Sequence, residues 1–237
     1  MRRGFGFSLI ESLLALALTL AVVLGALEFF GFGRVFFSRM KDRSEERRAA
    51  LTALDKVEDD LDRAGRSLAV PIGKGLVEGL AAGVGRLTIV ASERELHPAA
   101  DIQPGQTRVA VADAEEIMPG RELVLYDGDN AQIFSIVSFK SGELLLTPEA
   151  GALYRKEESR LLLLYRVEYF LDPSAGIVRR RENGGSGQPL LELVAGWESA
   201  YDRDRNIAAV RLSRSTPRGE IHDITVFPKN LAPSFSR

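Results

Sequence analysis

An uninterrupted apolar stretch near the N-terminus constrains this chain more than any other feature of its sequence. Residues 12–27 (SLLALALTLAVVLGAL) carry no charge, and residues 7–27 are interrupted only by Glu11. A helix that crosses a bilayer needs about 20 mostly apolar residues, so this stretch is long enough to span a membrane. Arg2 and Arg3 precede it. The positive-inside rule then predicts a cytoplasmic N-terminus, with the remaining ~200 residues outside the cytoplasm.

Two common explanations for such a stretch fit it poorly. A cleaved secretory signal usually has an apolar core of about 7–15 residues and then a small-residue cleavage site. This stretch is longer, and the residues that follow it, Glu28-Phe29-Phe30, are not the small residues of a cleavage site. A plain signal anchor gives no role to Glu11, although a carboxylate costs about 2.5–3.5 kcal/mol at the membrane centre and less near its edge. We therefore expect a functional role for Glu11; the alternative is an interfacial residue that reaches water.

The residues around Glu11 match a known pattern. The string Gly6-Phe7-Ser8-Leu9-Ile10-Glu11 resembles the processing site of type IV prepilins and type II secretion pseudopilins, G-F-[ST]-L-[IV]-E. The resemblance implies that a prepilin peptidase cleaves between Gly6 and Phe7, that Phe7 is then N-methylated, and that the first helix packs into a filament. It also implies that Glu11 of one subunit pairs with the Phe7 amine of a neighbour, since burying either charge unpaired is costly.

A helical pattern continues beyond the apolar stretch. Apolar residues recur at spacings of three and four, which predicts a one-sided buried stripe. Its members are Leu51, Leu54, Val57, Leu61, Ala64 and Leu68. Gly65 and Pro71 are stop signals, so we expect one helix from about residue 8 to residue 64. Glycines at 25, 31 and 33 favour either local melting of this helix or close helix–helix packing.

After Pro71 the pattern changes to short runs typical of β-strands. The predicted strands are 86–91, 107–112, 122–126, 131–139, 142–147, 160–171, 177–181, 206–214 and 221–227, with a hairpin turn at 127–130 and a glycine-rich loop at 73–85. The expected fold class is α+β. A long N-terminal helix, half apolar and half amphipathic, packs on a mainly antiparallel, pilin-like β head.

Four segments follow from these boundaries. We expect a leader at residues 1–6, whose charge comes from Arg2 and Arg3, and a transmembrane or filament-core helix at 7–33. An amphipathic continuation covers 34–70, and a β-rich head covers 71–237.

The last third of the chain resembles a subgroup of the same family. The runs YRVEYFLD (165–172), GIVRR (176–180) and QPLLELV (188–194) are similar to the pattern of the minor pilin W class and of the J-type minor pseudopilin of type II secretion. The similarity covers roughly residues 160–231. It implies a minor subunit of the filament.

Composition excludes several kinds of chemistry. The chain has no cysteine, so disulfides, thiolate metal sites and cysteine nucleophiles are excluded, and two histidines make a multi-histidine metal site implausible. We expect no enzyme activity, no cofactor and no metal. Asp202-x-Asp204-x-Asn206 and Asp127-Gly128-Asp129-Asn130 are weak calcium candidates. A net charge of -2 gives no reason to expect nucleic acid as a partner.

The sequence therefore predicts a minor type IV pilin or pseudopilin at or near a filament tip. Expected partners are a prepilin peptidase, other major and minor pilins or pseudopilins, and an inner-membrane assembly platform. The expected location is the bacterial inner membrane, single-pass with the head outside the cytoplasm, and then a periplasmic or cell-surface filament. A pilin-anchored adhesin or DNA-uptake module stays open, as does a membrane-tethered enzyme. The sequence does not distinguish a pilus from a secretion or competence system.

Overall fold

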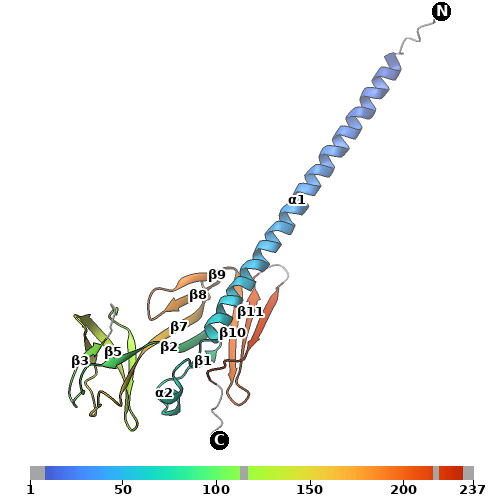
Figure 1. Cartoon of the computed structure of the whole chain (residues 1–237). Helices are drawn as coiled ribbons and strands as arrows, with labels where there is room; N and C mark the ends of the chain where they lie inside the picture. The colour runs from blue at the N-terminus through green and yellow to red at the C-terminus, as the bar shows by residue number, and fades with distance from the viewer. Residues whose placement is uncertain (1–8, 113–116, 216–218, 232–237) are drawn as a thin grey trace, which may run out of the picture. The chain divides into compact units, whose positions relative to one another are not determined.

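The computed structural model describes residues 9–112, 117–215 and 219–231 (Figure 1). The chain divides into two compact units, Met1–Ala49 and Ala50–Arg237, and the first helix passes from one into the other. The elements are α1 (Leu9–Leu61), α2 (Ala69–Gly73), β1 (Leu80–Gly83), β2 (Arg86–Pro98), β3 (Arg108–Ala112), β4 (Glu122–Tyr126), β5 (Ala131–Lys140), β6 (Glu143–Thr147), β7 (Arg160–Asp172), β8 (Ile177–Glu182), β9 (Gln188–Leu191), β10 (Val194–Asp202), β11 (Ile207–Arg214) and β12 (Ile221–Val226). The fold class is α+β, as the sequence predicts: one long helix and an antiparallel β domain.

Helix α1 is continuous over 53 residues, with no proline in its length. It ends at Leu61, three residues before the predicted end at Ala64. Gly65 adopts a left-handed φ of 72°, and its N–H donates to the carbonyl of Val90 at 2.8 Å. A left-handed glycine is a common way to end a helix, because it turns the chain without a Cβ clash. Here the hydrogen bond to Val90 ties the end of the helix to strand β2, and the chain continues into α2.

The last turns of α1 are amphipathic as predicted, but the stripe is shifted at its start. Leu54, Val57 and Leu61 are buried, as are Ala64 and Leu68 beyond the helix end. The prediction for Leu51 is wrong, because its side chain is 45% exposed. Two small residues, Ala50 and Ala53, take the buried positions at this end. They allow the helix backbone to approach the sheets closely.

The segment after α1 differs from the prediction in two places. Pro71 does not stop a helix but lies buried inside the short helix α2, within its first turn. The first-turn N–H groups of a helix have no partner in the helix, so a proline there removes no hydrogen bond. The region predicted as a glycine-rich loop contains strand β1, which pairs antiparallel with the start of β2.

All nine predicted strands are present, with bounds close to those expected, except that β2 continues to Pro98. The predicted hairpin turn also forms, since Tyr126 pairs with Ala131 and the N–H of Asp127 donates to the carbonyl of Asn130 at 2.9 Å. Strands β1, β9 and β10 were not predicted from the sequence.

Six strands close into a small antiparallel barrel. The pairings β2–β3, β3–β6, β6–β5, β5–β4, β4–β7 and β7–β2 form a complete ring. Closure leaves these strands no free edges within the ring. The interior is filled by large apolar side chains, among them Phe134, Tyr154 and Leu161. Figure 1 shows this part of the head around β3 and β5, apart from β8 to β11.

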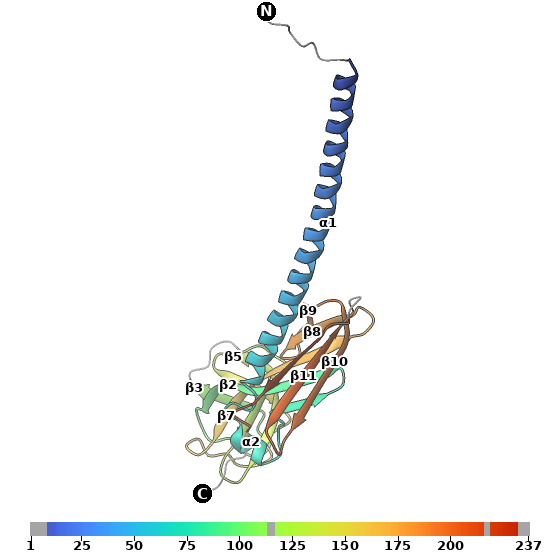
Figure 2. The same ribbon diagram turned by 90° about the vertical axis from the view of Figure 1, so that its right-hand side faces the viewer.

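The long strands β2 and β7 leave the barrel and continue into a second layer. There β7 pairs with β8 and β8 with β9, while β2 pairs with β1. A bridge between Val84 and Glu198 links this sheet to the three-stranded sheet β10–β11–β12. Both sheets contribute to one core around the last turns of α1, with Tyr169 and Trp197 as its largest side chains. Figure 2 shows β10 and β11 in this part of the head.

Candidate functional site

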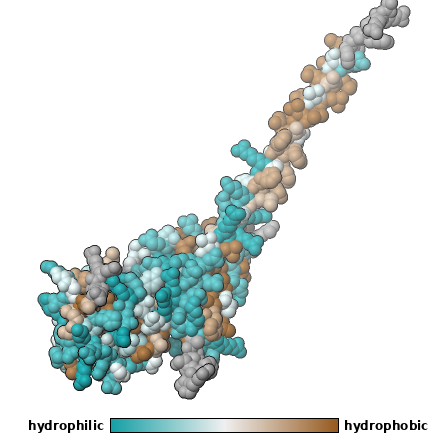
Figure 3. All heavy atoms as spheres, viewed as in Figure 1, coloured by the Kyte–Doolittle hydropathy of each residue, from teal (hydrophilic) through white to brown (hydrophobic). Residues whose placement is uncertain are grey.

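The first part of α1 is apolar on all sides. Its most hydrophobic 18-residue window has a mean hydropathy of 2.4, and none of that window is buried in the protein. By length and composition, α1 is the one described helix that could cross a membrane. Figure 3 shows apolar side chains along this part of the helix and polar side chains further along it. A helix that exposes this much apolar surface needs a lipid or protein environment.

The predicted processing site lies largely outside the described residues. Gly6 and Phe7, together with Arg2 and Arg3 of the leader, precede the first described residue. Glu11 is described: it is exposed and lies in the first turn of α1.

The basic residues that flank the apolar stretch change the argument about orientation. Six follow it at exposed positions, namely Arg34, Arg39, Lys41, Arg43, Arg47 and Arg48. Arg2 and Arg3 precede it. Because the positive-inside rule counts Lys and Arg near both ends of a span, the count does not support the orientation predicted from the leader alone. A cytoplasmic N-terminus therefore depends on the resemblance to prepilins.

The end of α1 is held on the sheet by a buried ion pair. Asp60 is 1% exposed, and its Oδ2 accepts hydrogen bonds from the Tyr169 hydroxyl at 2.6 Å and from Arg180 Nε at 2.8 Å. Lys56 Nζ lies 3.5 Å from Oδ1. Tyr169 and Arg180 are directly opposite each other on β7 and β8, so one carboxylate fixes the helix against two strands. Asp60 lies in phase with the buried apolar stripe of α1, and that position is the sequence signal for its burial.

Two further side chains extend this arrangement, which we call the Asp60 cluster (Asp60, Tyr165, Tyr169, Arg180 and Glu182). Arg180 also pairs with Glu182, and the Tyr165 hydroxyl donates to Glu182 at 2.8 Å. Burial raises the pKa of Tyr169 well above its usual value, and the neighbouring Asp60 charge raises it further. Burial also raises the pKa of Glu182, but the hydrogen bonds from Tyr165 and Arg180 outweigh it and lower that pKa overall.

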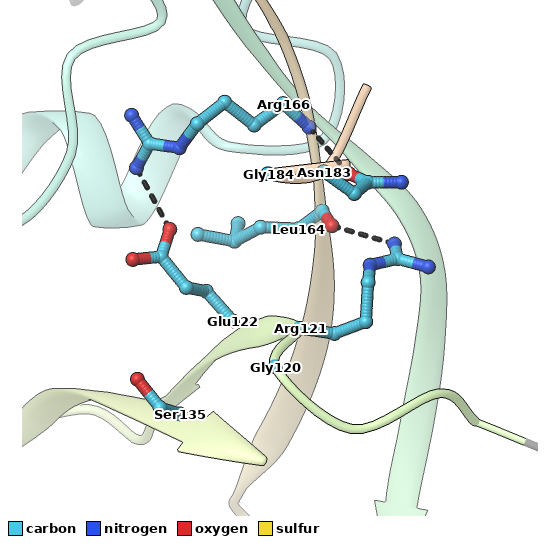
Figure 4. Close-up of a pocket in the computed structure, with 8 residues that line it drawn as sticks. All are labelled: Gly120, Arg121, Glu122, Ser135, Leu164, Arg166, Asn183 and Gly184. Carbon is cyan, nitrogen blue, oxygen red and sulfur yellow. Dashed lines mark hydrogen bonds and ion pairs between the residues drawn. The ribbon is translucent and has the colours of Figure 1, made fainter. Parts of the chain in front are cut away.

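A small pocket lies where the barrel meets the second layer, in which β7 pairs with β8 (Figure 4). We call it the junction pocket. Its volume is about 180 Å³, and its polar lining comes from Arg121, Glu122, Ser135, Arg166 and Asn183. Arg166 Nη2 donates to Glu122 at 2.8 Å. Arg121 Nη2 donates to the carbonyl of Leu164 at 2.7 Å and also pairs with Glu93.

The junction pocket exists because one edge of β7 changes partner. Strand β4 pairs with residues 160–163 of β7, and β8 pairs with residues 167–172. Residues 164–166 therefore have no strand beside them on that edge. Their backbone groups bond to other parts of the chain instead: Leu164 to Arg121, and Arg166 to Asn183, whose Oδ1 accepts at 2.9 Å and whose N–H donates at 2.8 Å. Two side chains and the Asn183 N–H thus satisfy these backbone groups at the gap.

The two weak calcium candidates form ordinary turns. Asp127 Oδ1 accepts the backbone N–H groups of Asp129 and Asn130. Burial raises the pKa of Asp127, but these hydrogen bonds lower it further than burial raises it. Asp202 Oδ1 accepts two backbone N–H groups in the same way. The Asn206 side chain accepts from the Tyr201 hydroxyl and donates to the carbonyl of Pro228. Over the part of the chain that the structure describes, no three His, Asp or Glu side chains gather as a metal site.

These features define a protein with one apolar helix fit to cross a membrane and an antiparallel β head that contains a barrel. No protein-family model matches the chain, and no curated protein matches it.

The chain is similar to solved structures over a limited region, among them two phage tailspikes. The Gp54 tailspike of Acinetobacter baumannii bacteriophage AP22, solved in complex with A. baumannii capsular saccharide, is 21% identical with a TM-score of 0.29; the match covers 32% of this chain and 15% of that one. The Pseudomonas phage phi297 tailspike gp61 is 13% identical with a TM-score of 0.26, over 32% of this chain and 14% of the tailspike. A likeness of this extent assigns neither a fold nor a function.

Proposed function

We propose that this chain is a minor type IV pilin or pseudopilin. In this proposal a prepilin peptidase cuts between Gly6 and Phe7, and the cut chain enters a filament at or near its tip. The observation that carries the proposal is the string from Gly6 to Glu11, which stands directly before a membrane-length apolar helix. The head would be a pilin-like domain outside the cytoplasm, and the chain would stay in the bacterial inner membrane until assembly.

The arrangement of α1 supports this proposal physically. A filament subunit needs an apolar helix that can leave lipid for a protein environment, and a head that is attached to the end of that helix. The first need is met by the exposed apolar surface of α1. The second is met by the buried stripe of Leu54, Val57 and Leu61, together with the Asp60 cluster. Apolar contacts are non-directional, so they set no axial register. In a filament, Glu11 would supply that register by pairing with the Phe7 amine of a neighbour.

The proposal is tested by following the chain into filaments. Filaments sheared from cells that express the full chain should contain it, together with other pilins or pseudopilins. Glu11→Val should leave the amount of chain in the membrane fraction unchanged and reduce its amount in sheared filaments. Glu28→Val is the matched control, since it removes a carboxylate later in the same helix. Equal incorporation of the Glu11 variant and the native chain would contradict the role given to Glu11.

A further inference from the structure

We propose that the part of α1 that follows its apolar stretch binds the headgroups of anionic phospholipids. This part, residues 34–48, is called the basic segment below. The proposal does not rest on the filament function, since it requires only that the apolar part of α1 lies in a membrane. It also makes no use of the orientation of the chain in that membrane.

The basic segment has a local excess of positive charge. It contains six cations and three acids, which leaves three positive charges, in a chain whose net charge is -2. All six cations are exposed. Among the described residues only Lys41 of these six has an ion-pair partner, Glu45 at 3.7 Å, and both side chains of that pair are more than half exposed. Exposed pairs contribute little, so the cations are available to a partner from outside the chain.

The six cations form two rows along the helix. Because an α-helix turns by about 100° per residue, residues spaced by four or by seven lie one above the other. One row is Arg34, Lys41 and Arg48, and the other is Arg39, Arg43 and Arg47. The two rows lie nearly opposite each other and divide the rest of the helix surface into two sides.

The two sides between the rows differ in character. One of them carries the acids, which are Glu28, Asp42, Glu45 and Glu46. Phe37 and Met40 lie on the other side, and their side chains are 72% and 52% exposed. The helix thus presents exposed apolar side chains flanked by cations, with the acids facing away. This arrangement is typical of a helix that contacts an anionic membrane surface.

The basic segment also begins where a headgroup layer would lie. Arg34 is seven residues beyond Leu27, the last residue of the charge-free stretch, which is about 10 Å along the helix. Phe29, Phe30 and Phe32 lie between them and are exposed. Headgroups occupy roughly 5–8 Å on each side of the hydrocarbon core, and an arginine side chain is long enough to reach back to them. In Figure 3 polar side chains follow the apolar part of the helix directly. This position favours lipid over a soluble acidic partner.

The experiment measures which lipid gathers around the basic segment. The chain has no cysteine, so Ser44→Cys provides one position for a fluorescent donor. The full chain is reconstituted into vesicles of four parts phosphatidylcholine to one part phosphatidylglycerol, with a trace of either lipid carrying an acceptor on its acyl chain. Phosphatidylglycerol should be enriched around the donor at least about fivefold over phosphatidylcholine, since one cation near an anionic surface contributes about that factor. Added sodium chloride should weaken the preference, because it screens surface charges.

Two variants with an equal loss of charge locate the effect. The first neutralises the membrane-proximal cations of the basic segment: Arg34→Gln, Arg39→Gln, Lys41→Gln and Arg43→Gln. The second neutralises four exposed cations of the head: Arg108→Gln, Arg155→Gln, Arg203→Gln and Lys229→Gln. The preference should disappear in the first variant and persist in the second. Both keep the apolar stretch and should stay with the vesicles, and circular dichroism checks that each keeps its helix and strands.

Three outcomes would overturn the proposal: equal transfer to the two lipids, a preference that salt does not weaken, or an equal loss of preference in both variants. A second copy of the chain is the competing occupant. Transfer between donor-labelled and acceptor-labelled copies, together with no lipid preference, would assign the basic segment to that copy and would also overturn the proposal. Because the vesicles contain neither a peptidase nor other filament subunits, such a failure would leave the filament proposal standing.

Discussion

The Tyr169 hydroxyl donates to Asp60 Oδ2 at 2.6 Å, across the boundary between the last turn of α1 and strand β7. Both residues are buried, and Arg180 on β8 completes the contact with the same oxygen. A buried ion pair adds little net stability over an apolar pair, but removing one partner leaves the other charge without compensation. The contact therefore acts chiefly to fix one register of the helix on the sheet.

The first prediction concerns this buried charge. Asp60→Ala should lower the free energy of unfolding of the head by about 1–3 kcal/mol, because the buried Tyr169 hydroxyl loses its acceptor and Arg180 keeps only its pair with Glu182. Asp59→Ala, at the exposed neighbouring position, should change it by less than about 0.5 kcal/mol. Urea unfolding of the full chain in detergent, followed by Trp197 fluorescence, measures both. Trp197 reports this region well, since its ring stacks on Tyr169 with 6.0 Å between centroids.

A paired substitution separates charge from packing. Asp60→Leu combined with Arg180→Met removes both charges and keeps apolar volume, so the double variant should be more stable than Asp60→Leu alone. If the double variant is the less stable of the two, the charge of Arg180 left without Asp60 is not the cause of the loss.

The second prediction concerns alkaline pH. The folded state raises the pKa of Tyr169 above its usual 10.0, chiefly through burial. The stability that depends on the neutral hydroxyl is therefore fully present below pH 10.0 and is lost as pH rises above it, since the unfolded chain ionises first. Tyr169→Phe should flatten this alkaline loss. It should also lower stability at neutral pH by about 1.5–3 kcal/mol, because a hydrogen bond to a carboxylate disappears.

Tyr126→Phe is the control for the second prediction. Burial raises the pKa of Tyr126 too, but this residue is only partly buried and has no part in the Asp60 cluster. Unfolding curves by circular dichroism at several alkaline pH values give the comparison. If the two variants flatten the alkaline loss equally, the pH effect does not come from Tyr169 in particular.

The sequence predicted what local patterns encode. The long helix, nine strands and the hairpin at 127–130 were recognisable, because each carries its own periodicity or turn signal. Strand β10 was missed because one of its inward positions is Ser199, a polar residue. Its hydroxyl accepts from the N–H of Gly83 at 3.0 Å and donates to the carbonyl of Arg86 at 2.8 Å. These partners lie more than 100 positions away in the chain, so no local pattern reveals them.

The barrel and the junction pocket could not be predicted from the sequence, because they too depend on contacts between residues far apart in the chain. Closure depends on two residue pairs between β2 and β3, His97 with Ala112 and Pro98 with Val111. The second half of β2 was not predicted, because a run of charged residues follows Ser92. In that half, exposed side chains alternate with more buried ones. The junction pocket depends on where β4 and β8 stop along β7. The processing site, by contrast, is predicted from a local sequence signal, and it lies largely outside the described residues.

The third prediction concerns a close approach near the end of the described chain. A Cβ at Gly79 would lie 2.5 Å from Leu231 Cδ2 and 3.1 Å from both Gly65 Cα and Ile72 Cδ1. Gly79→Ala should therefore destabilise the head by about 1–3 kcal/mol. The effect should shrink in a Leu231→Ala background, where the nearest atom is gone. Gly83→Ala, which meets nothing within 4 Å, should be neutral or slightly stabilising. Equal losses at both glycines in urea unfolding would argue against this contact.

The central claim is that this chain is processed as a prepilin. Its most direct test is intact mass with N-terminal sequencing of the membrane-extracted full chain, expressed with and without a prepilin peptidase. With the peptidase, the chain should begin at N-methylated Phe7; without it, the chain should begin at Met1. A chain that keeps Met1 in the presence of an active peptidase, or one cut after Ala26 by a general signal peptidase, would contradict the account.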